Sequence, residues 1–141
     1  MRKNFFGLIL FGLIQAQYLF SFDIETASKI YDKLFYAVFE KTNIKVFVND
    51  DEYKQMILSS KNLVLSESIN MSDIVIVTSE NDLINIQDKV AFAIEKSLLE
   101  KNTNIIGAFY WNKGRPEIIF IKDRLAHYNL KITESFEKYV K

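Results

Sequence analysis

Three side chains suited to acid–base chemistry or anion binding lie close together near the C-terminus. Asp123, Arg124 and His127 follow an apolar segment, and His127 is the only histidine of the chain. A general base or a nucleophilic triad needs partners within hydrogen-bond reach, and no second histidine or cysteine accompanies this group. We predict instead that Asp123 caps a short helix, that Arg124 and His127 share one face of it, and that His127 is structural. No catalytic residue is assigned, and we do not expect an enzyme.

An acidic run at 49–52 offers oxygen ligands for a divalent cation. The later ligands and the glycine of a calcium-binding loop are missing from the residues that follow. Acids in the first turn of a helix interact favourably with its dipole, so we interpret Asp50, Asp51 and Glu52 as a helix start. The four glycines form no phosphate-binding loop. The sequence therefore predicts neither a metal site nor a cofactor.

The composition narrows the class of protein. The 141 residues are 49% hydrophobic, which fits one domain with its own core. Lysine and arginine together number 18, as do aspartate and glutamate, so no basic field indicates nucleic-acid binding. The chain has no cysteine, which excludes a disulfide framework, a thiolate metal cage and a cysteine nucleophile.

The N-terminus has the pattern of a secretory signal peptide. Arg2 and Lys3 precede an uncharged apolar run at 5–16, which is shorter than the roughly 20 residues of a membrane span. We predict a signal peptide at 1–21, cleaved after Ser21 or after Ala16, with an uncleaved membrane anchor as the alternative. Export to the periplasm would leave 16 basic and 18 acidic residues, a formal charge of −2, in a single domain at 22–141.

Hydrophobic periodicity predicts the elements of this domain. Apolar residues at helical spacing cover 23–40, and a short helix is expected at 50–60. The run Ile-Val-Ile-Val within 72–79 fits a central strand buried on both faces, followed by a helix that Ser79, Asn81 and Asp82 can cap. The further strands are expected at 43–48, 62–68, 89–95, 104–111 and 116–121, with a turn or short helical bridge at 96–102. For 89–95, a continuation of the preceding helix is the alternative. The order predicts a layered α/β domain with a mixed, mostly parallel sheet flanked by helices, a C-terminal β-hairpin and short helices.

The hairpin supplies the candidate binding residues. Gly114 fits its turn, and a glycine inside a strand, here Gly107, marks a bulge or the close approach of another backbone. The aromatic side chains nearby are candidates either for a partner interface or for the core, because aromatic residues anchor both. Arg115, beside Glu117, could bind an anion, but a charged strand edge that discourages association is the favoured interpretation. The interface candidates are Phe109, Trp111, Arg115 and Phe120.

The C-terminal half of the chain also carries a family resemblance. The segments "KVAFAIE", "NIIGAFYW", "KGRPEIIFIKDRLAHYNLKI" and "TESFEKYV", with "ASKIYDKLFYAVF" earlier, resemble the YfiR-like family of small periplasmic proteins. The chain departs from the family's pattern in lacking paired glycines at Gly107, in carrying Ile121 and Asp123, and in having no cysteine. The resemblance implies a non-enzymatic periplasmic protein that binds the periplasmic part of a membrane-bound diguanylate cyclase and lowers cyclic-di-GMP signalling.

Two functions follow as hypotheses. The first is this periplasmic regulatory module, which would present an exposed apolar patch to a membrane-bound sensor or cyclase. The second is a small periplasmic ligand-binding protein, with a pocket at the carboxyl ends of the parallel strands near Asn49, Ser66, Thr78 and Ser79. A homodimer is left open, and no nucleic-acid partner is expected.

Overall fold

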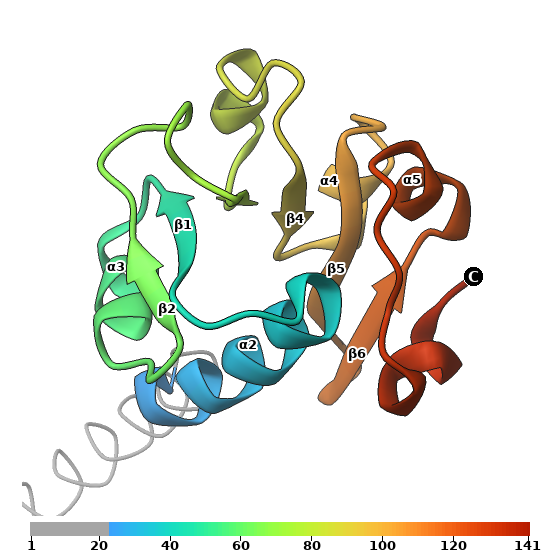
Figure 1. Ribbon diagram of the computed structural model, residues 1–141, viewed down its shortest axis with the longest axis horizontal. Coiled ribbons are helices and arrows are strands. Elements are labelled where there is room, and N and C mark those ends of the chain that lie inside the picture. Colours follow the sequence, from blue (N-terminus) through green and yellow to red (C-terminus); the bar gives the residue numbers. More distant parts are fainter. Residues whose placement is uncertain (1–22) are drawn as a thin grey trace, which may run out of the picture.

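The computed structural model describes residues 23–141, so the predicted signal peptide lies outside the described residues. The described chain forms one six-stranded sheet in the order β2-β1-β3-β4-β5-β6 (Figure 1). Strands β1 to β5 run parallel, and β6 is antiparallel to β5. The strands are β1 (Ile44–Val48), β2 (Leu63–Leu65), β3 (Ile74–Val77), β4 (Ala91–Ala93), β5 (Ile105–Asn112) and β6 (Arg115–Phe120). This confirms the predicted α/β class with a mostly parallel mixed sheet and a C-terminal hairpin.

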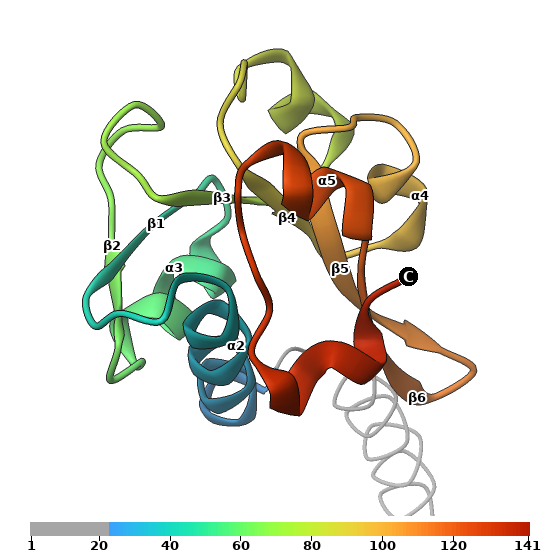
Figure 2. The same ribbon diagram turned by 45° about the vertical axis from the view of Figure 1, so that its right-hand side comes forward.

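Helices cover both faces of the sheet. The α-helices are α2 (Ile24–Phe39), α3 (Asp51–Leu58), α4 (Lys96–Leu99) and α5 (Lys122–His127), and the 3₁₀ helices are η1 (Glu80–Ile84) and η2 (Glu134–Tyr139). Helix α2 lies across one face, with α3 beside it (Figures 1 and 2). None of the helices of residues 23–141 is long and apolar enough to cross a membrane.

Two hydrophobic cores lie on opposite faces of the sheet. Strand β3 contributes to both, because Ile74 and Ile76 belong to the core under α2 while Val75 and Val77 belong to the other. Alternation of side chains along a strand produces this division. The prediction that this strand is central and buried on both faces is therefore confirmed.

Local signals fix the ends of α2. Asp23 is the N-cap, and its carboxylate accepts a hydrogen bond from the backbone N–H of Thr26. Glu40 ends the helix in a left-handed conformation with φ 49°. In the middle of the helix, Asp32 accepts from the backbone N–H groups of Lys61 and Asn62. This carboxylate joins α2 to the loop that leads into β2.

The hairpin is built by its turn residues and by Gly107. Lys113 and Gly114 both have positive φ, 52° and 79°, which is the two-residue turn that matches the twist of a hairpin. The β4–β5 register shifts between Ala91 and Phe92, next to the Phe92–Gly107 pair. A Cβ at Gly107 would meet the Ile119 carbonyl oxygen far inside van der Waals contact. Of the two alternatives predicted for Gly107, the close approach of another backbone is confirmed, and the β4–β5 register is irregular beside it.

Two capping predictions have different outcomes. The Asp82 carboxylate accepts from the backbone N–H of Ser79, so the predicted cap is present, although the helix that follows is a 3₁₀ turn. The prediction that Asp123 is an N-cap is wrong. Helix α5 begins at Lys122, after Ile121, which has no side-chain cap. Asp123 lies inside the first turn, where a carboxylate still interacts favourably with the helix dipole.

Candidate functional site

Arg124 holds the backbone together at the C-terminal cluster. Its Nη1 atom donates to the carbonyl oxygens of Leu99 at 2.7 Å, Ile105 at 2.8 Å and Asn102 at 3.3 Å. These carbonyls lie at the end of α4, in the connection that follows it and at the start of β5. His127 is exposed, and its ring lies edge-on to Tyr128 with 5.0 Å between the ring centroids. The predicted structural role of this cluster is therefore supported, while the convergence of carbonyls on Arg124 was not predicted.

Replacing Arg124 with methionine is expected to lower the free energy of unfolding by about 1–3 kcal/mol. The methionine keeps much of the aliphatic packing but leaves partly buried carbonyls without their donor. The control His127→Ala should change stability by less than about 0.5 kcal/mol, because this side chain is exposed. Urea denaturation measures both values. Equal effects of the two variants would contradict the structural role of Arg124.

The acidic run at 49–52 starts helix α3. The Asp50 carboxylate accepts from the backbone N–H of Tyr53 at 3.1 Å, and Asp51 and Glu52 lie in the first turn. This confirms the interpretation of the run as a helix start. Within residues 23–141, no group of three or more histidine, cysteine, aspartate or glutamate side chains is arranged to hold a metal ion.

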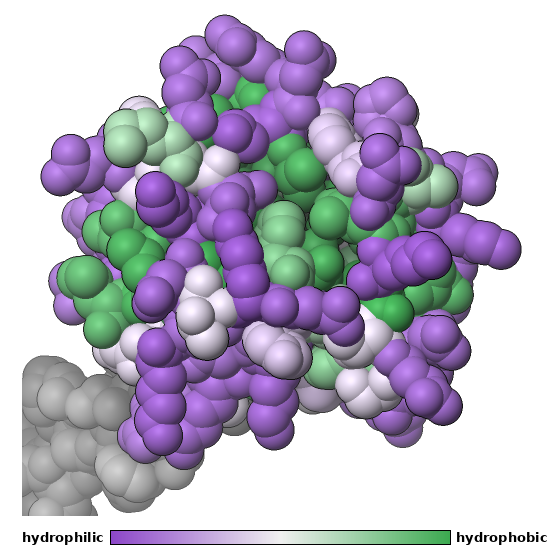
Figure 3. Space-filling view, viewed as in Figure 1, coloured by the Kyte–Doolittle hydropathy of each residue, from purple (hydrophilic) through white to green (hydrophobic). Residues whose placement is uncertain are grey.

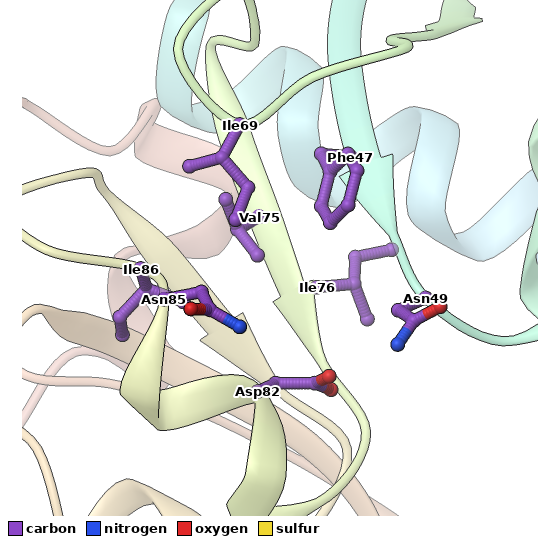
Figure 4. A pocket seen from close by; sticks show the side chains of 8 residues that line it. All are labelled: Phe47, Asn49, Ile69, Val75, Ile76, Asp82, Asn85 and Ile86. Atoms are coloured by element: carbon purple, nitrogen blue, oxygen red, sulfur yellow. The ribbon is translucent and has the colours of Figure 1, made fainter.

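A small cavity lies between the carboxyl ends of β1 and β3. It has a volume of about 70 Å³, well below the roughly 300 Å³ at which small-molecule sites begin. The position is where neighbouring connections leave the sheet in opposite directions, the usual place for ligands in open α/β sheets. Figure 4 shows its lining residues, which are Phe47, Asn49, Ile69, Val75, Ile76, Asp82, Asn85 and Ile86.

Of the four residues predicted to line a pocket, Asn49 alone lines this cavity. The N–H and hydroxyl of Thr78 and the N–H of Ser79 donate to the Asp82 carboxylate, so they organise the loop after β3. The buried Ser66 hydroxyl donates to the carbonyl of Ser68 at 2.8 Å and is not among the lining residues. The structure therefore brings Asn49 and Asp82 together and leaves Ser66 out.

A second hollow, at the opposite end of β3 and β4, was not predicted. It has a volume of about 470 Å³. Lys89 lines this hollow, and its Nζ atom donates to the carbonyl oxygens of Ser72 at 2.8 Å and Asn70 at 3.2 Å. The Tyr128 hydroxyl donates to the carbonyl of Asp88 at 3.1 Å. These contacts close the loops before the two strands, so the polar groups serve the fold.

All four interface candidates lie on the β5–β6 hairpin. Phe120 is fully buried and takes the core alternative predicted for it. Phe109 is half-buried and stacks on the buried Tyr31, with 5.9 Å between ring centroids. Trp111 follows at 6.3 Å from Phe109 and is 68% exposed. The three rings of Tyr31, Phe109 and Trp111 therefore lead from the core to the surface.

Arg115, the remaining candidate, lies at the accessible end of the hairpin, and a separate apolar area lies nearer the middle of the molecule (Figure 3). Arg115 is exposed and pairs with Asn112 beside the turn. Figure 3 shows apolar surface near the middle of the face that carries α2, framed by hydrophilic residues. Large exposed apolar side chains in such a setting are typical of protein contact sites.

Tyr31, at the buried end of the row of rings that includes Phe109 and Trp111, also contacts a second tyrosine, Tyr53. The rings of Tyr31 and Tyr53 meet edge-on at 6.1 Å. Burial raises the pKa of Tyr31 well above its usual value, and the Tyr53 hydroxyl and its charge raise it further. Burial also raises the pKa of Tyr53, and the carboxylates of Asp50, Glu52 and Glu95 add to that effect.

The two phenols are expected to make the fold sensitive to alkali. Their folded-state pKa values lie above the usual value of 10.0, so their contribution to stability is complete below pH 10 and is lost as the pH rises above it. Denaturation midpoints measured across this range should fall, and the fall should be smaller in Tyr31→Phe. An identical pH dependence in that variant would contradict the assignment.

Comparison with known proteins supports the fold class described above. No protein-family model matches the sequence, and no curated protein matches it. The structure is similar to a crystal structure described as a conserved domain protein from Vibrio cholerae, with 12% sequence identity and a TM-score of 0.55. The match covers 84% of this chain and 60% of that chain, so this chain spans about 60% of its neighbour's length. The likeness shows the fold alone: a single α/β domain with a mostly parallel sheet.

Proposed function

We propose that this protein is an exported regulatory protein that acts by contact, restraining a membrane-bound diguanylate cyclase through the periplasmic part of that enzyme. The observation that carries the proposal is the position of Trp111. Its side chain is 68% exposed and contacts Phe109, which in turn stacks on the buried Tyr31. A rigidly supported, exposed tryptophan is the kind of side chain that dominates binding energy at interfaces. The resemblance to the YfiR-like family supplies the class of partner and the periplasmic location.

The polar groups that converge in the structure support contact over bond-making. Arg124, Lys89 and Asp82 each hold backbone groups of neighbouring loops. A side chain already committed to such bonds is poorly placed to move a proton or attack a substrate. These roles favour a protein that presents a surface.

Affinity capture tests the proposal. The tagged protein is used to capture partners from the membrane and periplasmic fractions of its own cells. We expect a diguanylate cyclase in the captured material, and we expect Trp111→Ala to reduce its recovery at least about tenfold, as at an interface hot spot. The matched control is Leu58→Ala, because Leu58 is also an exposed apolar residue, at 62%, but lies on α3. Equal recovery by both variants, or no cyclase with the wild type, would reject the proposal.

The alternative function is binding of a small ligand at the cavity between β1 and β3. The observation in its favour is that Asn49, Asp82 and Asn85 lie around one hollow at the expected edge of the sheet (Figure 4). Native mass spectrometry of the purified protein tests it. A small molecule that co-purifies with the wild type and is lost in Ile86→Trp, which fills the cavity, would establish this function. An unliganded mass in both proteins would exclude a tightly bound ligand.

A further inference from the structure

The β5–β6 hairpin continues beyond the strand that pairs with it. The β4–β5 ladder ends at the Ala93–Ala108 pair, while β5 continues to Asn112. Figure 1 shows β5 and β6 running past the end of β4, and Figure 2 shows their turn projecting away from the other strands. One side of β5 is therefore left without a neighbouring strand over its last residues.

The register identifies the backbone groups on that side. The N–H of Ile121 donates to the carbonyl of Ile106, and antiparallel hydrogen-bonded pairs recur at every second residue. Ala108, Tyr110 and Asn112 therefore direct their backbone groups to β6, whereas Phe109 and Trp111 direct theirs to the β4 side. Within residues 23–141, the Phe109 carbonyl and the N–H and carbonyl of Trp111 have no strand partner. Such groups are a template for an added strand.

The two outer strands of the sheet, β6 and β2, present fewer unpaired backbone groups to an added strand. On β6, Pro116 has no N–H, and the carbonyl of Phe120 accepts from the backbone of Lys141 at 2.8 Å. Only Ile118 presents both backbone groups outward on that strand. At the opposite end of the sheet, β2 has three residues. Short edges and a proline discourage strand addition.

The side chains around the open part of β5 define the chemistry of an incoming segment. Phe109 and Trp111 offer apolar rings on one face. Glu95 is exposed and follows the last residue of β4, Ala93, by two positions, so its carboxylate lies where a strand in line with β4 would begin. The inner end of the open edge is therefore acidic.

Basic residues of the chain lie at the other end of the open edge. Lys113 belongs to the turn, and Arg115 begins β6 directly after it. The charge along the edge thus changes from negative beside Glu95 to positive at the turn. A segment with a basic side chain at the end nearest β4 would complement it.

We propose that residues 109–111, together with Glu95, form a slot that binds an extended, basic segment of a protein partner by adding a short strand beside β5. This inference rests on the proposed function, because it requires a protein partner. The added strand would lie in line with β4, its backbone would pair with Phe109 and Trp111, and alternate apolar side chains would cover the two rings. Lysine or arginine side chains at its inner end would face the Glu95 carboxylate.

The single tryptophan of the chain reports directly on this slot. The probe is a short capped peptide in which valine alternates with polar residues, lysine at one end and threonine elsewhere, titrated into the purified protein in the form that accumulates in the cell. Because Trp111 is exposed in the free protein, we expect a saturable blue shift of its fluorescence. Binding should weaken with added salt and should be at least about tenfold weaker for the matched peptide with glutamate in place of lysine.

Two further measurements separate strand addition from simple attraction. Methylation of alternate peptide nitrogens removes backbone donors, and we expect it to abolish the shift. Glu95→Gln should weaken binding about threefold, the size of one exposed ion pair, whereas Glu100→Gln at the far end of α4 should leave it unchanged. The proposed strand addition at this slot would be contradicted by any of three outcomes. These are no shift with the lysine peptide, equal binding of the glutamate peptide, and unimpaired binding of the methylated peptide.

These outcomes are distinct from those of the proposed function. The titration uses purified protein and synthetic peptide, so it is independent of any cyclase. Peptide binding without capture of a cyclase would reject the proposed regulation and keep the slot. Capture of a cyclase that requires Trp111, without peptide binding, would keep the regulation and reject the slot.

Discussion

Replacing Phe92 with alanine is expected to destabilise the protein by about 3–5 kcal/mol, a large share of the stability of a domain this size. Phe92 is fully buried in the central strand β4. Its ring lies 5.5 Å from Phe35, 5.8 Å from Phe120 and 5.9 Å from Tyr31, measured between centroids. The truncation would leave a cavity bounded by α2, β4 and the hairpin. Such a cavity collapses poorly, because the surrounding rings are fixed on α2 and on β6, which pack from different sides.

The control for this variant is Ile84→Ala. Ile84 is also a large apolar side chain, but it is 79% exposed on η1. Its replacement should change the free energy of unfolding by less than about 0.5 kcal/mol. Equilibrium denaturation in urea, followed by far-ultraviolet circular dichroism, measures both. A loss of less than about 1 kcal/mol in Phe92→Ala would contradict its central position in the core.

Replacing Gly107 with alanine is expected to cost about 3 kcal/mol or more, the upper end of the range for overpacking. The added methyl would overlap the backbone carbonyl of Ile119, and it would lie 2.9 Å from Phe120 and 3.2 Å from Phe92. The first of these neighbours is backbone and cannot rotate away. The β5–β6 pairing would have to open or shift to make room.

Gly114→Ala is the matched control for steric cost. A Cβ at Gly114 meets nothing within 4 Å, but its φ of 79° is a conformation that side chains disfavour. We expect a loss of about 1 kcal/mol from that conformation alone. Thermal and urea unfolding of the two variants should therefore differ by about 2 kcal/mol. Equal losses would contradict the close approach of the Ile119 carbonyl to Gly107.

The elements predicted from sequence are those that local patterns determine. The apolar stripe of α2, the Ile-Val-Ile-Val run of β3 and the glycine turn of the hairpin each specify their structure within a few residues. The parallel sheet followed from the alternation of strands and helices. Gly107 was interpretable for the same reason, since a glycine inside an apolar strand implies a crowded backbone.

The features missed from sequence depend on contacts between distant segments. Arg124 binds carbonyls of Leu99 and Ile105, and Lys89 binds the carbonyl of Ser72. Nothing in the local pattern marks a lysine or arginine as a backbone ligand, because the partners are set by how loops pack. The prediction that Asp123 is a cap failed for a different reason. Strand β6 ends at Phe120, one residue earlier than predicted, and the helix begins at Lys122 without a side-chain cap.

The candidate site shows the same division. The aromatic residues of the hairpin were recognised as candidates, but alternation alone could not distinguish the buried Phe120 from the exposed Trp111. That difference arises because β4 ends at Ala93 and leaves the last part of β5 uncovered. The length of a neighbouring strand therefore decides which aromatic side chain is available to a partner.

Intracellular cyclic-di-GMP is the measurement that tests the central claim most directly. Cells lacking this protein are compared with cells that express the wild type or Trp111→Ala, the latter at matched periplasmic abundance. We predict that deletion raises cyclic-di-GMP, that the wild type restores the lower level, and that Trp111→Ala does not. Unchanged cyclic-di-GMP on deletion, or full restoration by Trp111→Ala, would contradict regulation of a cyclase through the exposed end of the hairpin.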